Sequence, residues 1–227
     1  MTGTTPSPRW ERRKEDRPGD LLAAALIEFT ERGYAATRLE DVAARAGVSK
    51  GTLYLYYPGK EALFQAVIRE SIVPLLADYE STVAGSDAPS AELLERFFQD
   101  WWRYFGSTQL AGLCKLIVAE SGNFPDVARF FQQEVVEPEG RLLGDIIERG
   151  IARGEFRQVD VECLVEISLS PMVMRAIWQH SIEPVCPLGR IELDRFLACH
   201  LDQLLAYLGQ PGRYCPRGPA GTPELLE

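Results

Sequence analysis

The sequence predicts an all-α protein, and three features of its 227 residues support this class. Apolar residues recur three and four positions apart along most of the chain, which is the period of one helix face. No segment alternates apolar and polar residues as a half-buried strand would. Glycine and proline separate the periodic segments at intervals of about one helix length, where such residues end helices.

The first helix is expected to span residues 17 to 32. Its apolar face carries Leu22, Leu26 and Phe29 at helical spacing. Gly33 follows the last turn, and a residue without Cβ readily adopts the left-handed conformation that ends many helices. The sequence therefore places the first chain reversal at Gly33.

Residues 37 to 60 predict two short helices joined by a tight turn. The first has apolar residues at i, i+3, i+4 and i+7 counted from Leu39. Thr37 lies just before it, where a hydroxyl can cap free helix amides. Gly47 follows it, where a left-handed turn conformation suits glycine, and Val48 can fill the corner between the helices.

The second of these helices begins at Ser49, which is a suitable N-cap. Leu53 and Tyr57, four residues apart, are expected to face inward. Pro58 and Gly59 then end the helix. These signals place a short helix directly after the turn.

The spacing of small residues indicates how the two helices cross. Ala43 is small where two helices meet closely, Gly47 lies four residues further on, and Leu53 lies six beyond that. This pattern describes helices packed at a steep angle across a short turn. It is typical of the helix-turn-helix motif, whose second helix enters the major groove of DNA.

The polar residues of the second helix agree with this interpretation, because no carboxylate occurs between Asp41 and Glu61. A helix N-terminus with free amides also favours a phosphate. The alternative is a surface helical hairpin with a glycine turn, which would require all of these signals to coincide by chance. We expect most contacts to position the protein on DNA and few to read bases.

Together with the preceding helix, residues 20 to 70 resemble the DNA-binding domain of the tetracycline-repressor (TetR) family. The matching segments are residues 24–37, 42–43, 46–54 and 60–63. The match covers about a quarter of the chain. The remainder resembles the family in length and in its all-helical character.

The resemblance implies the residues that contact DNA. In this family a hydroxyl before the motif touches phosphate, a Ser-Lys-Gly-Thr run begins the recognition helix, and a tyrosine follows. A histidine that is frequent in the family is replaced here by Tyr56. The candidate DNA-binding residues are Thr37, Arg38, Ser49, Lys50, Gly51, Thr52, Tyr54, Tyr56 and Lys60.

The remainder of the chain predicts a helical bundle. A helix from Lys60 should kink or stop at Pro74, and a short loop should cover residues 84–89. The later apolar stripes run over residues 94–105, 127–135 (ended by Pro138), 143–151 (capped by Gly154), 160–178 (with Pro171 inside) and 193–208. We therefore expect a helical effector-binding and dimerisation domain over residues 63–209, after a helix-turn-helix domain over residues 18–62.

The aromatic stripe of residues 94–105 is a candidate wall of an apolar ligand cavity. Ordinary core packing is the alternative for each residue taken singly. The cavity as a whole, and a small apolar or amphipathic effector in it, are what the resemblance implies. The candidate ligand-binding residues are Phe98, Trp101, Trp102, Phe105, Phe130, Phe131, Met172, Met174 and Trp178.

The last two long helices carry more apolar surface than the edge of a core needs. Such helices pair across a two-fold axis, and a homodimer would present two recognition helices to a palindromic operator. The resemblance implies the same assembly. The alternative is that both stripes face only the core of one chain.

Charge is distributed unevenly along the chain. The whole sequence has 24 basic and 33 acidic residues, but residues 1–70 hold 11 basic against 10 acidic ones. The acidic excess therefore belongs to the bundle and leaves the motif free of it. Affinity for DNA phosphates should be modest and strongly dependent on salt.

The ends of the chain are expected to be flexible. Residues 1–17 form a basic arm, which is either a solvated tail or a segment that reaches DNA, and residues 210–227 form a tail rich in proline and glycine.

The sequence shows neither a secretory signal nor a membrane span. The five cysteines lack paired or metal-like spacing. We expect a cytoplasmic protein with reduced thiols.

Other functions fit less well. Residues 47–51 match G-x-S-x-G, and Ser49, Asp194 and His200 can be written as a triad, but a helix stands where a nucleophile elbow needs a strand. His180 and His200 alone make no metal site, and no cofactor is expected. The sequence thus predicts a ligand-responsive transcriptional repressor and no enzyme. The remaining alternative is a DNA-binding protein controlled by a protein partner without a small ligand.

Overall fold

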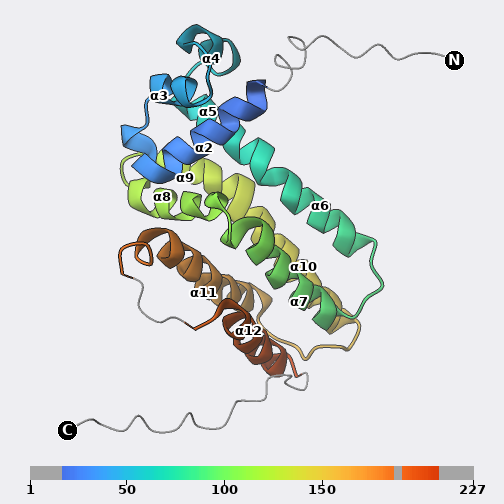
Figure 1. Cartoon of the computed structure of the whole chain (residues 1–227). Coiled ribbons are helices and arrows are strands. Elements are labelled where there is room, and N and C mark those ends of the chain that lie inside the picture. Colours follow the sequence, from blue (N-terminus) through green and yellow to red (C-terminus); the bar gives the residue numbers. More distant parts are fainter. Residues whose placement is uncertain (1–16, 187–190, 210–227) are drawn as a thin grey trace, which may run out of the picture.

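The computed structural model describes residues 17–186 and 191–209, and it contains helices and no strand within these ranges (Figure 1). The predicted all-α fold is confirmed. The flexible arm and tail proposed from the sequence lie outside the described residues, apart from Arg17, which begins the first helix.

Four helices form the head of the molecule, at the top of Figure 1. They are α2 (Arg17–Ala36), α3 (Leu39–Arg45), α4 (Lys50–Tyr56) and α5 (Lys60–Ser71). The body contains α6 (Val73–Ala84), α7 (Ser90–Trp101), α8 (Gly112–Glu120), α9 (Pro125–Phe131), α10 (Glu137–Ala152), α11 (Val161–Ser181) and α12 (Leu193–Tyr207). Three short turns of other helix types lie between them: η1 (Trp102–Gly106), η2 (Gln109–Ala111) and η3 (Gln132–Val136).

The turn between α3 and α4 forms as its sequence predicts. Gly47 has a φ of +68°, in the left-handed region. The Ser49 hydroxyl accepts a hydrogen bond of 3.1 Å from the backbone amide of Thr52 and so caps α4. Leu53 is fully buried beneath this turn. The packing of α4 across α3 therefore depends on one left-handed glycine, one cap and one apolar anchor.

The capping role predicted for Thr37 is wrong. The residue at the N-cap of α3 is Arg38, which has extended backbone and no side-chain cap. Thr37 lies one residue earlier, and its hydroxyl donates to the carbonyl oxygens of Glu28 and Gly33, at 3.0 and 2.7 Å. Gly33 has a φ of +83°, which turns the end of α2 toward Thr37. The hydroxyl therefore fastens the end of α2 instead of the start of α3.

The helix predicted to end at Pro138 also differs from the structure. The backbone stays helical from α9 through η3 into α10, and Pro138 occupies the first turn of α10. A proline breaks a helix because it lacks an amide and crowds the carbonyl four residues earlier. Here the π-helical turn η3 comes directly before it and replaces that bonding pattern. The proline is therefore accommodated inside one long helical rod.

Head and body meet where α2 lies across α8 (Figure 1). Gly112 at the start of α8 allows this approach, because a Cβ there would lie 2.9 Å from Cγ2 of Thr30. At the other end of α8, the Glu120 carboxylate accepts a 3.0 Å hydrogen bond from the amide of Ala35. This α2–α8 contact, which we call the seam, fixes how the head sits on the body.

We predict that Gly47→Val destabilises the protein by about 2 kcal/mol, because a β-branched residue resists a positive φ. No neighbouring atom lies within 4 Å of a Cβ at this position, so the effect is conformational rather than steric. Chemical denaturation measures it. Gly51→Ala, inside α4 at ordinary helical φ, is the control and should leave stability unchanged or raise it. Equal losses in both variants would contradict the assignment.

Candidate functional site

The outer face of α4 is exposed and carries hydrogen-bond donors. Tyr54 and Tyr56 are exposed on it, and α4 has no acidic residue in its first turn. The Ser49 hydroxyl caps the amide of Thr52, and the other amides of the first turn have no partner within the helix. A phosphate can therefore approach this end of α4 without meeting a carboxylate on the helix.

Lys50 is held in place by two neighbours. Its ammonium forms an ion pair with the carboxylate of Glu40 on α3, and it lies 5.7 Å from the centre of the Tyr54 ring. The hydrogen bond to Lys50 lowers the pKa of Glu40, and the same bond raises the pKa of Lys50. Both side chains are half exposed, so the pair contributes little to stability. A DNA phosphate can compete for this lysine.

Sequence reasoning missed one residue of this face. Leu55 lies between the two candidate tyrosines and is 85% exposed. Leu55 does not lie on the face of α4 that carries the buried residue, and this spacing can be read from the sequence. An exposed aliphatic side chain on a recognition helix suits contact with a thymine methyl group.

Two of the nine candidate DNA-binding residues serve the interior of the head. Thr37 is only 2% exposed. The Lys60 ammonium donates to the carbonyl oxygens of Tyr34, Ala35 and Thr37, at 2.7, 3.0 and 3.2 Å. Burial lowers the pKa of Lys60. Three carbonyls occupy the three protons of the ammonium, so Lys60 stabilises the C-terminal end of α2. The other seven lie at the surface of α3 and α4 or partly so: Arg38, Ser49, Lys50, Gly51, Thr52, Tyr54 and Tyr56.

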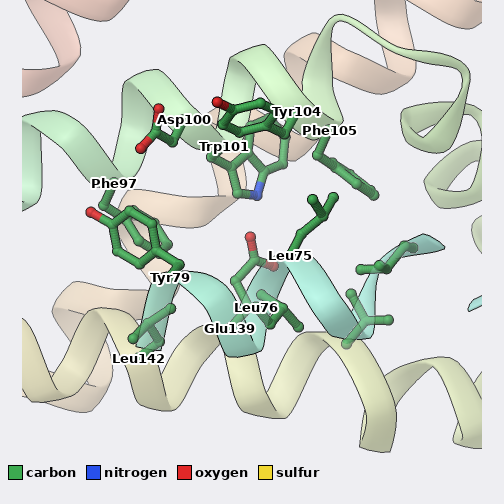
Figure 2. A pocket seen from close by; sticks show the side chains of 12 residues that line it. Leu75, Leu76, Tyr79, Phe97, Asp100, Trp101, Tyr104, Phe105, Glu139 and Leu142 are labelled. Atoms are coloured by element: carbon green, nitrogen blue, oxygen red, sulfur yellow. The ribbon is translucent and has the colours of Figure 1, made fainter. Parts of the chain in front are cut away.

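The body contains a cavity between α6, α7 with η1, and the rod formed by η3 and α10 (Figure 2). Its volume is about 70 Å³. One water needs roughly 10–15 Å³ of cavity volume, so the cavity has room for a small organic molecule. Its lining residues are Ile72, Leu75, Leu76, Tyr79, Phe97, Asp100, Trp101, Tyr104, Phe105, Val135, Glu139 and Leu142.

Both π-helical turns border this cavity. The turn η1 carries Tyr104 and Phe105, and η3 carries Val135. A π-helical turn inserts one residue into a helix and rotates the side chains that follow, which is why such turns are frequent at functional sites. Gly106 closes η1, and a Cβ there would come within 2.7 Å of two tryptophan rings. The aromatic wall is thus packed tightly from behind.

The structure places the nine candidate ligand-binding residues in different surroundings. Trp101 and Phe105 line the cavity. Phe98, Trp102, Phe131 and Met172 are buried but do not line it. Phe130 lies under the guanidinium of Arg69, 4.9 Å from its ring centre, and Met174 and Trp178 are exposed on α11.

The most unusual residue of the cavity is Glu139 of α10, which sequence reasoning did not single out. It is only 8% exposed, and burial raises the pKa of its carboxyl to about 7. A hydrogen bond from the Trp101 indole partly opposes this rise, and Figure 2 shows the indole nitrogen facing the carboxyl. The second acid of the lining, Asp100, pairs with Arg96 at 3.4 Å and Arg103 at 3.9 Å.

A second apolar surface lies on the far side of the body, along α11 and α12. Large apolar side chains are exposed there: Ile167, Met174, Trp178 and Tyr207. On its inner side α11 packs closely on α10, where a Cβ at Gly140 or Gly144 would lie 3.6–3.7 Å from the valines of α11. The exposed apolar side chains of α11 therefore lie on its outer face, away from the side that packs on α10.

Comparison with known proteins gives consistent relatives. A family profile described as "Bacterial regulatory proteins, tetR family" matches residues 21–67, and one described as "Tetracyclin repressor-like, C-terminal domain" matches residues 91–185. The HTH-type transcriptional repressor KstR2 of Mycolicibacterium smegmatis is 28% identical over 164 residues, or 71% of this chain and 76% of that protein. The HTH-type transcriptional regulator RutR of Escherichia coli is 52% identical over 126 residues, or 56% of this chain and 51% of that protein.

Among solved structures, the transcriptional regulator FadR from Bacillus subtilis in complex with stearoyl-CoA has the same fold. Its TM-score is 0.69 at 19% identity, and the alignment covers 83% of this chain and 98% of that one.

We predict that Lys60→Met destabilises the head by about 2 kcal/mol, because it leaves carbonyls at the end of α2 without a donor. Thermal denaturation of the full chain measures this loss. Lys50→Met removes an equally charged but half-exposed lysine and is the matched control, with no change expected. Equal melting temperatures for the two variants would show that Lys60 has no such structural role.

A second prediction concerns Glu139 and pH. Its pKa is higher in the folded state, about 7 against an ordinary 4.5, so the folded state holds the extra proton between these values and stability falls as pH rises through this window. Glu139→Gln should therefore match the wild type below pH 4.5 and exceed it by about 3 kcal/mol above pH 7. Denaturant titrations at both ends of the window test this. Glu137→Gln, exposed on the same helix, should show no such pH-dependent gain.

Proposed function

The chain belongs to the TetR family of bacterial transcriptional regulators, and on that premise we propose that it is a homodimeric repressor of a palindromic operator, released by a small effector. The helix-turn-helix domain, residues 18–62, binds DNA, and residues 63–209 bind the effector and form the dimer. One observation carries this proposal: the cavity wall α6 follows directly on the head helix α5. Control by a protein partner without a small ligand is not favoured.

The head supports sequence-specific binding through α4. This helix presents tyrosines, a lysine, hydroxyls and one exposed leucine on a single outer face. The polar groups suit phosphates and base edges, and Leu55 suits an apolar base contact. We propose that DNA binding represses transcription, in keeping with KstR2, a relative named as a repressor.

The outer face of α11 and α12 supports dimerisation. Exposed Ile167, Met174 and Trp178 lie along one helix of 21 residues, which a second copy of the chain would cover. Pairing of identical faces produces a two-fold axis. Two heads related by that axis would read two identical half-sites, and this is why we propose a palindromic operator.

The route from effector to DNA runs through the junction of α5 and α6. Ile72 lies at this junction and lines the cavity. Its amide donates to Ile68 of α5 at 2.9 Å, and its carbonyl accepts from the amide of Leu75 in α6 at 3.0 Å. An effector that displaces α6 therefore also displaces α5. If the displaced arrangement mismatches the operator, effector and DNA weaken each other by the same factor.

We place the repressor in the cytoplasm, where its DNA lies. Within residues 17–186 and 191–209, no helix combines the length and the apolar character that crossing a membrane requires.

The experiment that tests the function is selection of bound sequences from a random DNA pool by the purified protein. We expect an enriched palindrome. Lys50→Ala should weaken binding to it about tenfold and reduce the slope of log affinity against log salt by about 1, because one phosphate contact is lost. Arg129→Ala, which removes an exposed cation of the body, is the control and should leave both quantities unchanged. A folded protein that enriches no sequence would overturn the proposal.

A further inference from the structure

We propose, taking effector control as given, that the cavity selects effectors with a compact organic cation, such as an ammonium group, on an aromatic or aliphatic body. The cation would lie against the carboxylate of Glu139 and the aromatic wall. This assignment deepens the proposed function, since it names the chemical class of the effector.

The charge of the lining is the first argument. Of its 12 residues, Asp100 and Glu139 are carboxylic acids, and none is lysine, arginine or histidine. Asp100 is compensated at the surface by Arg96 and Arg103. Glu139 has no basic partner within the part of the chain that the structure describes, and its hydrogen bond there comes from the Trp101 indole. A carboxylate has about four acceptor positions, so most of them are left for a ligand.

The aromatic wall is the second argument. Five of the lining residues are aromatic, and Figure 2 shows them around the space above Glu139: Tyr79, Phe97, Trp101, Tyr104 and Phe105. Faces of aromatic rings attract cations, most strongly where water is excluded. Carboxylate and rings together therefore favour positive charge, whereas leucine and isoleucine of the same lining suit the apolar body of the ligand.

Other charge states fit the cavity less well. An anionic effector would bring a second negative charge beside Glu139, with no cation in the lining to offset it. A neutral effector offers the carboxylate no opposite charge, so part of the Glu139 carboxyl stays protonated at neutral pH and forms no ion pair. A cation pairs with the charged form, so this class draws the most affinity from the buried acid.

The protonation of Glu139 gives the site a measurable signature. Burial raises its pKa to about 7, and a bound cation would draw this pKa down. The other titratable groups around it are Asp100, Tyr79, Tyr104 and, through space from α8, Cys114. Burial raises the pKa of both Tyr79 and Cys114, so neither titrates near neutrality. Binding of a cation should therefore weaken as pH falls below about 7.

Calorimetric titration of the purified protein with three compounds of similar size tests the proposal. They are phenethylamine, which is cationic, phenethyl alcohol, which is neutral, and phenylacetate, which is anionic. We expect phenethylamine to bind at least about tenfold more tightly than the other two at pH 8. Glu139→Gln should remove this preference without weakening the alcohol, and Glu137→Gln, exposed on the same helix, should keep it.

Phenyltrimethylammonium, whose charge does not depend on pH, provides the second measurement. Its affinity should fall about tenfold per pH unit below pH 7 in the wild type and stay constant in Glu139→Gln. Since the glutamine variant is expected to be at least as stable as the wild type, loss of binding is separable from unfolding.

The same compounds, added to the complex with the selected operator, separate the two proposals. Release of DNA by the amine, and not by its analogues, supports the cationic class. Release by phenylacetate or phenethyl alcohol with equal or better affinity would leave the effector-controlled repressor standing and overturn the cationic class. If no compound of any charge binds or releases DNA, effector control through this cavity fails, and the proposal about its chemistry fails with it.

Discussion

The C-terminal end of α2 is the constraint on which the rest of the structure depends. A helix end leaves backbone carbonyls without partners, and here Lys60 of α5 satisfies those of Tyr34, Ala35 and Thr37. From the body, Glu120 of α8 accepts from the amide of Ala35. Hydrogen bonds at this one helix end thus join α2 to α5 within the head and join α2 to α8 of the body. The orientation of the recognition helix α4 follows from this shared end, because α4 rests on α3 and α3 rests on α2.

Two of the attachments between head and body differ in kind. The seam is tight, since Gly112 of α8 touches Thr30 of α2 where a Cβ would not fit. The other attachment is the junction of α5 and α6, whose far side faces a cavity with unfilled space. A tightly packed contact resists displacement, whereas a helix beside a cavity can shift without losing packing. Movement of α6 would therefore turn the head about the seam, which is the kind of change that alters the spacing of two heads in a dimer.

The parts of this molecule that the sequence predicts correctly are those fixed by local chemistry. The left-handed Gly47, the Ser49 cap and the buried Leu53 lie within seven residues of one another, so their geometry is encoded where it occurs. The role of Lys60 could not be predicted in this way, because its partners lie 23–26 residues earlier in the chain. The cavity lining was predicted only in part, for a different reason. Tyr104 lies three residues after Trp101, and Glu139 lies four after Val135, so both keep the helical spacing. Stripes built from apolar residues name Trp101 and Phe105 but pass over Tyr104 and Glu139, because a polar residue at such a position is normally expected at the surface.

Glu139 shows why such misses are informative. A leucine or methionine at this position would fill an apolar cavity without the desolvation of a charged group. The glutamate instead keeps a carboxyl with a pKa near neutrality among aromatic rings, at a cost in stability that the fold does not need. Local consistency fails mostly where function demands it. A group that destabilises the empty cavity and is relieved by one class of ligand couples binding to the arrangement of α6, α7 and α10. The same carboxylate that weakens the unliganded packing would then provide both the affinity for a cation and part of the free energy that moves the head.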